Sequence, residues 1–500
     1  MDGHRRLLAG PQGRRRGGNR HHRYRHPSQQ VGRGGTAIDP APGPTRAIAV
    51  AALCFGTIAV QFDSAVNIAF PDLVRAFALP IPDIQWIVIA YTLTYAALML
   101  VFGRAGDIFG HRAVFLLGAA ISAVAFALCA ISTAYGWLLA ARVLQGVGAA
   151  LALSCGPALI TSLYAEEHRA RVLSLYTLLI GFGGAIAPVV GGLLVERWGW
   201  PAVFAFRVPL ALAALAAGFA LPAGKARAVR EGFDGWGAAL LVLAIAVIVL
   251  ALNQLQGRDQ LLLSLALLGG SAVLGAAFVW REVSVDHPII DVRYFRDADF
   301  ALLNVAHMLL NLAGFAIFLL APFYLHAVGN LSAPAAGLVL AASPIGLILG
   351  APAAARLAGA IHARRMALIG AALSATGLLA ISLLGDRLSL LILVLASSLQ
   401  GFGVGLFQVA YFDIATATLP KKDRGVAGSL VLMTRTVGIV MGASVLMLAF
   451  RALSEAGSTD AGQGSLLAGF SGAFAIAGSI SLLVVVLALA RGWARKDGRA

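Results

Sequence analysis

The sequence predicts an all-α integral membrane protein with fourteen transmembrane helices, arranged as two six-helix bundles with two further helices inserted between them. Three observations predict this fold class. Apolar runs of transmembrane length follow one another along the chain, basic residues gather in alternate connections between those runs, and the first part of the chain is repeated in the last part.

The apolar runs predict the helices. Hydrophobic residues make up 59% of the chain and charged residues 12%, whereas soluble domains carry about 25% charged residues. A helix of about 20 apolar residues crosses a bilayer, and the runs lack the period-two alternation of a membrane β-barrel. The fourteen runs are 47–70, 84–103, 113–132, 136–161, 172–195, 202–221, 236–255, 261–280, 300–326, 334–355, 365–384, 389–414, 426–450 and 466–490.

The positions of the basic residues predict the orientation. With fourteen crossings and a cytoplasmic N-terminus, 30 of the 38 Lys and Arg residues lie in cytoplasmic tails and loops or, in the case of Arg365, at the cytoplasmic end of a run. Basic residues are enriched in the cytoplasmic loops of membrane proteins. Both termini are therefore expected in the cytoplasm, and the net charge of +15 is explained without a nucleic-acid partner.

The internal repeat predicts two related bundles. Residues 103–118 (GRAGDIFGHRAVFLLG) align without gaps with residues 355–370 (ARLAGAIHARRMALIG), and LQGVG at 144–148 aligns with LQGFG at 399–403. The loop after the second run thus matches the loop after the tenth, so the seventh and eighth runs lie outside the repeat. Many transporters are built from such repeats, with the substrate site between them.

The predicted domains follow from the runs and the repeat. They are a basic N-terminal tail (1–46), an N-terminal six-helix bundle (47–221), a linker with two inserted helices (222–299), a C-terminal six-helix bundle (300–490) and a cytoplasmic tail (491–500). The N-terminal tail contains ten Arg residues and no apolar core of signal-peptide length. It is either a disordered basic segment or in part the product of a misassigned start codon.

Enzyme chemistry is not expected. The cysteines Cys54, Cys129 and Cys155 all lie in apolar runs, where cysteine behaves as a small hydrophobic residue. The chain has no CxxC or HExxH motif and no nucleotide-binding glycine loop. We therefore expect neither a metal nor a cofactor.

Several motifs resemble those of the major facilitator superfamily, and more closely its fourteen-helix drug:proton antiporters. They are FDSAVNIAFPDL (62–73), GRAGDIFGHR (103–112), RVLQGVGAA (142–150), GFGGAIAPVVGG (181–192), FDGWGAALL (233–241) and WREVSVDHPIIDVRYF (280–295). The chain departs from the family pattern at Ile108, His111 and Ala187, and in the segment that contains Pro201 and Arg207. Arg207 is expected to add a charge near the outer end of the sixth run.

The resemblance implies proton-coupled efflux of small amphipathic organic molecules, such as drugs or antibiotics, by alternating access. The expected partners are the substrate, protons and the lipid bilayer, with the proton gradient as energy source. We expect a monomer in the bacterial inner membrane. Two alternatives stay open: a metabolite uptake carrier or facilitator, and a membrane sensor that no longer transports.

Two motifs supply candidate gating residues. In the loop after the second run, Gly103 and Gly110 are expected to permit a tight turn, and Asp107 is expected to pair across the two halves. In the fifth run, small residues allow close helix contact and a proline can bend the helix. A plain cytoplasmic turn and ordinary helix packing are the alternatives. The candidates are Gly103, Asp107, Gly110, Arg112, Gly184, Pro188, Gly191 and Gly192.

Polar residues within the runs are candidates for lining a substrate cavity. Asn304, His307 and Asn311 share one face of the ninth run, and helix–helix hydrogen bonding is the alternative role for that face. The candidates are Asn67, Tyr91, Gln145, Asn304, His307, Asn311 and Gln408. No role is assigned to Asp413, which we expect at the membrane interface, or to Arg435.

Asp63 and Arg142 are predicted to form the coupling site. Asp63 lies about 7–8 Å beyond the midpoint of the first run, and Arg142 about 9–10 Å from the midpoint of the fourth run toward the same side. The family resemblance implies that both helices face the central cavity. Arg142 would stabilise the ionised form of Asp63, and a proton or a cationic substrate would compete for the carboxylate. A purely structural ion pair and an interfacial aspartate are the alternatives.

Overall fold

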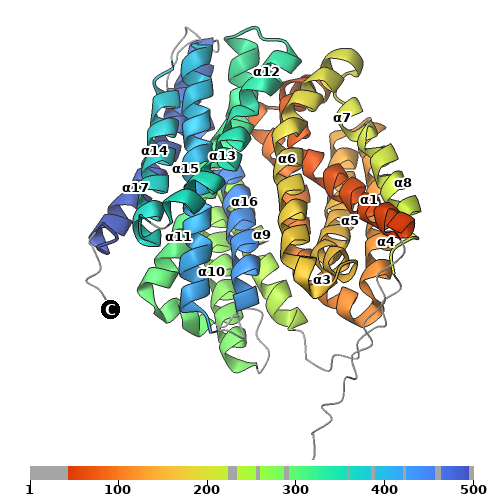
Figure 1. Ribbon diagram of the computed structural model, residues 1–500. Helices are drawn as coiled ribbons and strands as arrows, with labels where there is room; N and C mark the ends of the chain where they lie inside the picture. The colour runs from red at the N-terminus through yellow and green to blue at the C-terminus, as the bar shows by residue number, and fades with distance from the viewer. Residues whose placement is uncertain are drawn as a thin grey trace, which may run out of the picture. The chain divides into compact units, whose positions relative to one another are not determined.

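The computed structural model describes residues 43–222, 234–254, 260–285, 292–358, 360–384, 389–420, 424–456 and 463–494, all within one compact unit, Pro40–Ala500. Helices and the turns between them account for this part of the chain (Figure 1). The all-α prediction is therefore confirmed. Most of the predicted N-terminal tail, together with residues 495–500, lies outside the described residues.

The N-terminal half comprises residues 43–222. Its helices are α1 (Gly43–Gln61), the 3₁₀ helix η1 (Phe62–Ala69), α2 (Phe70–Ala76), the 3₁₀ helix η2 (Ile81–Ile84), α3 (Gln85–Phe109), α4 (His111–Ala130), α5 (Tyr135–Ser162), α6 (Glu166–Trp198), α7 (Ala202–Ala205) and α8 (Arg207–Gly218).

Two helices, α9 (Gly235–Gln254) and α10 (Leu261–Ser284), precede the C-terminal half, which comprises residues 292–494. The helices of that half are the 3₁₀ helix η4 (Val292–Arg296), α11 (Ala298–Ala327), α12 (Ala333–Leu340), α13 (Ala342–Leu357), α14 (Ala363–Ser382), α15 (Leu390–Thr418), α16 (Arg424–Ala456) and α17 (Gln463–Ala490).

Thirteen helical segments of the described chain are long and apolar enough to span a membrane. Each overlaps one of the predicted runs. The sixth predicted run, 202–221, contains the shorter apolar segment Ala202–Gly218, which α7 and α8 form together. The count of fourteen spanning helices therefore stays a prediction.

The sequence repeat reappears as a repeated packing contact. A side chain at Gly118 would lie 3.0 Å from the carbonyl oxygen of Gly148, and one at Gly370 would lie 2.5 Å from that of Gly403. The first pair joins α4 to α5, and the second joins α14 to α15. Because only glycine permits so close an approach, the aligned glycines serve the same contact in both halves. The predicted domain boundaries themselves stay a prediction.

The inserted helices α9 and α10 pack against each other, and α9 also contacts α3 and α16, one helix from each half. Large side chains of α10 such as Leu262 and Val273 are exposed. The pair therefore lies beside the two halves.

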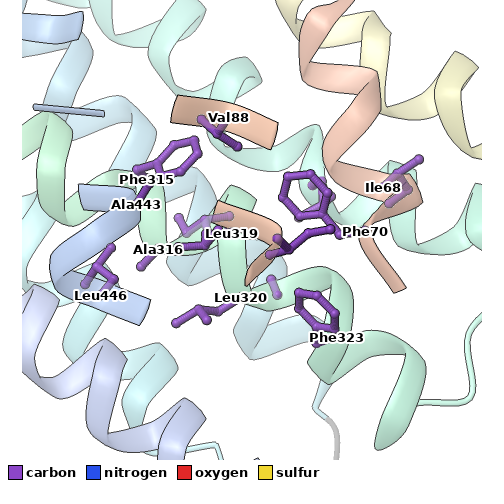
Figure 2. Packing of buried hydrophobic residues seen from close by; sticks show 14 of the residues in the cluster. Ile68, Phe70, Val88, Phe315, Ala316, Leu319, Leu320, Phe323, Ala443 and Leu446 are labelled. Carbon is purple, nitrogen blue, oxygen red and sulfur yellow. The ribbon is translucent and has the colours of Figure 1, made fainter. Parts of the chain in front are cut away.

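Among the residues that the structure describes, the hydrophobic core joins the two halves at one end only. A shared cluster combines Phe70 and Val195 of the N-terminal half with Phe323 and Leu446 of the C-terminal half. Figure 2 shows Ile68, Phe70 and Val88 gathered with side chains of α11 and α16. We call this end of the molecule the Phe70 end.

At the opposite end, which we call the Asp107 end, each half keeps its own core. One cluster contains only residues between Ala49 and Leu221, and another only residues between Phe300 and Trp493. Among the described residues the halves therefore share buried apolar surface at the Phe70 end and not at the Asp107 end.

Candidate functional site

Asp63 lies in an interruption of the first spanning segment. That segment, Thr45–Ala76, is α-helical up to Gln61, continues as the 3₁₀ helix η1 and returns to α-helix at Phe70. Pro71 has no N–H group, so it cannot donate to the carbonyl of Asn67, and the N–H of Phe70 donates to that carbonyl instead. A 3₁₀ stretch within a helix often marks a hinge. Asp63 is therefore inside the span rather than at a helix end.

Four hydrogen bonds from three side chains hold the Asp63 carboxylate. Both terminal nitrogens of Arg142 donate to it, with 3.0 Å between Nη2 and Oδ2. Gln145 Nε2 donates to Oδ1 at 2.8 Å, and Arg207 Nη1 donates to the same oxygen at 3.0 Å. Planar guanidinium groups suit such paired contacts with carboxylates. The structure thus brings Asp63 and Arg142 together and adds a second arginine.

The backbone and an aromatic ring fix Arg142 in α5. Its Nε donates to the carbonyl of Ile87 at 2.9 Å, and Nη1 donates to Gln145 Oε1 at 2.9 Å. The guanidinium carbon lies 4.5 Å from the centre of the Tyr91 ring. The side chain is 1% exposed. These contacts do not involve Asp63, so they hold the Arg142 side chain in place even if Asp63 moves.

Arg207, at the start of α8, is fully buried. Its Nε donates to the carbonyl of Val203 at 3.0 Å, and the guanidinium carbon lies 4.6 Å from the centre of the Phe126 ring. Its Nη2 atom is buried and has no hydrogen-bond partner. An unsatisfied buried donor is costly. Because two guanidinium groups share one carboxylate, the cluster of Asp63, Arg142 and Arg207 carries one excess positive charge.

The sequence contained a signal for Arg207 that the prediction did not use. Arg207 lies about 7 Å from the midpoint of the run 202–221, on the same side of the membrane midplane as Asp63 and Arg142. Its depth therefore matches that of Asp63 as closely as the depth of Arg142 does.

The predicted turn after the second run is made by Gly110 alone. Gly110 has φ +93°, ends α3 and precedes α4. Gly103 lies inside α3, and a side chain there would have its nearest neighbour at 3.9 Å. The prediction that Gly103 permits the turn is therefore wrong, because α3 extends six residues beyond it to Phe109.

The charged residues of this turn make local contacts. Asp107 lies 3.3 Å from His111 Nε2 and 3.9 Å from Arg104 Nη1, both on the same turn. Arg112 Nη2 donates to the carbonyl of Phe219 at 2.8 Å. In this structure the described ion-pair partners of Asp107 thus lie in its own half, and the expected pairing across the halves is not formed.

Two of the four candidate residues of α6, Pro188 and Gly192, contact the other half at the Phe70 end. A side chain at Gly192 would lie 2.3 Å from the carbonyl oxygen of Ala333, and one at Gly337 would lie 2.3 Å from that of Pro188. Gly191 closely approaches Ala65 of η1, which belongs to its own half. A side chain at Gly184 would instead meet open space. Small residues therefore let α6 and α12 approach within backbone contact.

The shared face of α11 forms helix contacts rather than a cavity wall. Asn304 accepts a hydrogen bond from the Tyr411 hydroxyl at 2.6 Å, and His307 Nδ1 lies 2.8 Å from Thr434 Oγ1. Asn304 and His307 are buried, and the amide of the half-buried Asn311 donates to the carbonyl of His307. The cavity-lining prediction for Asn304 and His307 is not met in this structure, because neighbouring helices use their polar atoms.

Of the remaining cavity candidates, two lie at the Asp63 cluster and two lie elsewhere. Gln145 belongs to the cluster, and Tyr91 covers its Arg142. Asn67 is buried in η1, while Gln408 in α15 is half-buried. Among the described residues no group of three or more His, Cys, Asp or Glu side chains is arranged to hold a metal ion.

Comparison with known proteins identifies the family. The sequence profile described as Major Facilitator Superfamily matches residues 53–286 and 303–499. A Streptomyces coelicolor protein named "Probable actinorhodin transporter" is 30% identical over 438 residues, which cover 84% of this chain and 75% of that protein. Multidrug resistance protein Stp of Mycobacterium tuberculosis is 27% identical, covering 76% of this chain and 71% of that protein.

A relative with a different cargo and a solved structure complete the comparison. Riboflavin transporter RibZ of Clostridioides difficile is 26% identical, covering 78% of this chain and 85% of that protein. The crystal structure of a bacterial homolog of the human lysosomal transporter Spinster has the same fold, with a TM-score of 0.64 and 16% identity over 91% of this chain and 97% of that one. These matches describe transporters, not enzymes. The chain belongs to the major facilitator superfamily, and its similarity to multidrug resistance and antibiotic transporters supports the drug-efflux type.

Proposed function

We propose that the protein exports small amphipathic organic molecules, such as drugs or antibiotics, in exchange for protons across the bacterial inner membrane. The observation that carries this proposal is the Asp63 carboxylate held by Arg142 and Arg207 within the first spanning segment. Ionisable residues inside membrane spans are costly and commonly mark proton or substrate pathways. The names of the multidrug resistance and antibiotic transporters supply the substrate class.

The proton step follows from the charge balance of the cluster. Protonation of Asp63 would leave two buried guanidinium groups without a counter-charge, and removing one partner of a buried ion pair costs about 3–5 kcal/mol. The ion pairs that join η1 to α5 and α8 would then be lost. Release of the proton would restore it. The 3₁₀ segment that carries Asp63 gives the first span a place to move.

Alternating access would exchange which end of the two halves is closed. With both termini in the cytoplasm, the Phe70 end faces the outside, so the shared cluster there would close the outer side in this conformation. Gly192 would permit that closure, because it lets α6 approach α12 of the other half. When the Asp107 end closes in turn, Asp107 would leave its local partners and pair across the halves.

The test is substrate-induced proton release from everted vesicles. A susceptibility screen in a pump-deficient host first identifies an exported compound. That compound is then added to vesicles with a preformed proton gradient, for the wild type, Asp63→Asn and Asp63→Glu. We expect Asp63→Asn to abolish proton release and Asp63→Glu to retain part of it, because only the latter keeps a titratable group.

Two further variants separate coupling from folding. The double variant Asp63→Asn/Arg207→Gln keeps the net charge of the cluster and should fold, yet it should not release protons. Asp72→Asn removes a carboxylate at the end of the same span, where Asp72 pairs with the exposed Arg75, and should behave as the wild type. Full exchange by Asp63→Asn would exclude Asp63 as the coupling site.

An uptake carrier is the second candidate, because one relative is a riboflavin transporter. The same vesicles distinguish the two directions. An exporter accumulates its substrate inside everted vesicles when they are energised, whereas an uptake carrier driven by the proton gradient does not.

A further inference from the structure

Arg435 is a cation in the interior of the C-terminal half that the function proposed above does not use. It lies about 16 Å into α16 from Arg424, inside the apolar span Leu430–Glu455. Its side chain is exposed, while Thr434 and Thr436 on either side of it are buried.

The guanidinium group of Arg435 lies near the N-terminal half. Its helix α16 packs on α11 and α17 of its own half and contacts α3 of the N-terminal half. Arg435 also interacts electrostatically with Tyr95 of α3, a helix of the N-terminal half that contacts α16. The guanidinium group therefore faces the interface between the halves rather than lipid.

No carboxylate of the described residues pairs with Arg435. Its electrostatic neighbours are the neutral groups Tyr95 and His307. Asp413 of α15 is exposed and lies only about 7–8 Å from the end of its helix, and no ion pair joins it to Arg435. A charge as deep as that of Arg435 is expensive unless a counter-charge or water compensates it.

The neighbouring Asp63 cluster cannot supply the missing negative charge. Its one carboxylate already serves two arginines, and Arg207 Nη2 is buried without a partner. Among the described residues the polar interior thus sets one carboxylate against three guanidinium groups. The electrostatic balance favours an anion and opposes a cation.

Two stacked tyrosines connect Arg435 with that cluster. Tyr91, which covers Arg142, stacks on Tyr95 with 6.1 Å between ring centres. The Tyr95 hydroxyl has no hydrogen-bond partner among the described residues and the side chain is only half-buried. It can donate to the same anion as Arg435, while the aromatic faces suit an apolar ring.

We propose that Arg435 and Tyr95 form a binding site for the anionic group, such as a carboxylate or sulfonate, of an amphipathic aromatic substrate. This inference rests on the proposed transport function and specifies its substrate class. The bound anion supplies the counter-charge that Arg435 lacks, and the two halves contribute one residue each. Binding at this place therefore depends on how the halves are arranged.

The test compares three ligands that differ in charge. The probes are 2-naphthoate, its methyl ester and 2-naphthylmethylamine, and the apparent Kd of each is taken from ligand-dependent thermal stabilisation of the purified full-length protein. We expect 2-naphthoate to bind at least about tenfold more tightly than the ester or the amine, equivalent to about 1.4 kcal/mol. Arg435→Gln should remove this preference, and Arg435→Lys should keep part of it.

Arg451→Gln is the matched control. It removes a positive charge from the same helix, where Arg451 pairs with Glu455 at the Phe70 end, and it should leave the preference for the acid unchanged. The proposal is overturned if the amine or the ester binds as tightly as 2-naphthoate, if 2-naphthoate does not bind, or if its preference survives Arg435→Gln. Proton-coupled export tested through Asp63 stands or fails independently of these results.

Discussion

At the scale of single residues, Arg142 and Arg207 share one carboxylate but differ in what else they contact. Arg142 donates two hydrogen bonds to the carboxylate, one to Gln145 and one to a backbone carbonyl, whereas Arg207 donates one to Asp63 and one to a carbonyl. Removal of Arg207 leaves a one-to-one ion pair of Asp63 with Arg142. Removal of Arg142 discards the two-point contact.

We therefore expect Arg142→Gln to destabilise the protein by about 3 kcal/mol, since charge-assisted hydrogen bonds contribute about 1.5–3 kcal/mol each. Arg207→Gln should change stability by less than about 1 kcal/mol, because it also removes the excess charge and the unsatisfied Nη2 atom. Thermal unfolding of both variants in the same detergent measures the difference. Equal losses would show that relief of the excess charge does not offset the hydrogen bonds that Arg207 donates.

The sequence was sufficient to predict the contact between Asp63 and Arg142. It was insufficient to predict the partners of Asn304 and His307. Depth along two apolar runs predicts that Asp63 and Arg142 lie at the same level, and the family resemblance implies that their helices face the same cavity. For Asn304 and His307, helical spacing gives a shared face but not what that face meets. Tyr411 and Thr434, which occupy their polar atoms, lie on helices more than 100 residues away along the chain. Which partner fills such a face is decided by tertiary packing.

At the scale of helices, prolines decide where three apolar runs are interrupted. Pro71, Pro209 and Pro344 lack the N–H group that would bond the residue four positions earlier. Those earlier residues are Asn67 in η1, Ala205 at the end of α7 and Leu340 at the end of α12. Hydropathy alone therefore predicts the runs, while the helical part of the sixth run, Ala202–Gly218, is shorter than the thirteen spanning segments.

The contact between α6 and α12 gives a prediction at this scale. Gly192→Ala places a methyl group 2.3 Å from the Ala333 carbonyl oxygen, so the two backbones must separate. Overpacking of this kind costs about 1–3 kcal/mol. We expect spin labels at the exposed positions Glu196 and Ser332 to show a new population at longer distance.

Gly184→Ala is the matched control, because a side chain at Gly184 of the same helix meets open space. The distance distribution in that variant should equal that of the wild type. If Gly192→Ala leaves the distances unchanged as well, the glycine contact does not hold the Phe70 end closed.

At the scale of the whole molecule, two halves of similar construction are joined by an asymmetric hydrophobic core. Equivalent glycine contacts build the two halves alike, and a shared cluster joins them at one end only. The sequence repeat predicts the paired construction. It does not predict which end is closed, because that depends on the small free-energy difference between two packings of the same halves.

The Asp63 cluster and the shared cluster are linked through the first span, which gives the last prediction. Phe70 follows η1 directly, and its ring stacks on that of Phe323, with 6.5 Å between ring centres. Asp63→Asn leaves Arg142 and Arg207 without a counter-charge, so η1 loses its anchorage and Phe70 its fixed position on Phe323. In a background without Cys54, Cys129 and Cys155, the substitution Leu320→Cys places a thiol in the same buried cluster and keeps both rings, and this thiol should be protected from a water-soluble maleimide. Addition of Asp63→Asn should raise its labelling rate about tenfold, equivalent to about 1.4 kcal/mol, whereas Asp72→Asn should not change it. Equal labelling rates in all three backgrounds would mean that the charge state of Asp63 does not reach the Phe70 end, and that protonation there cannot drive its opening.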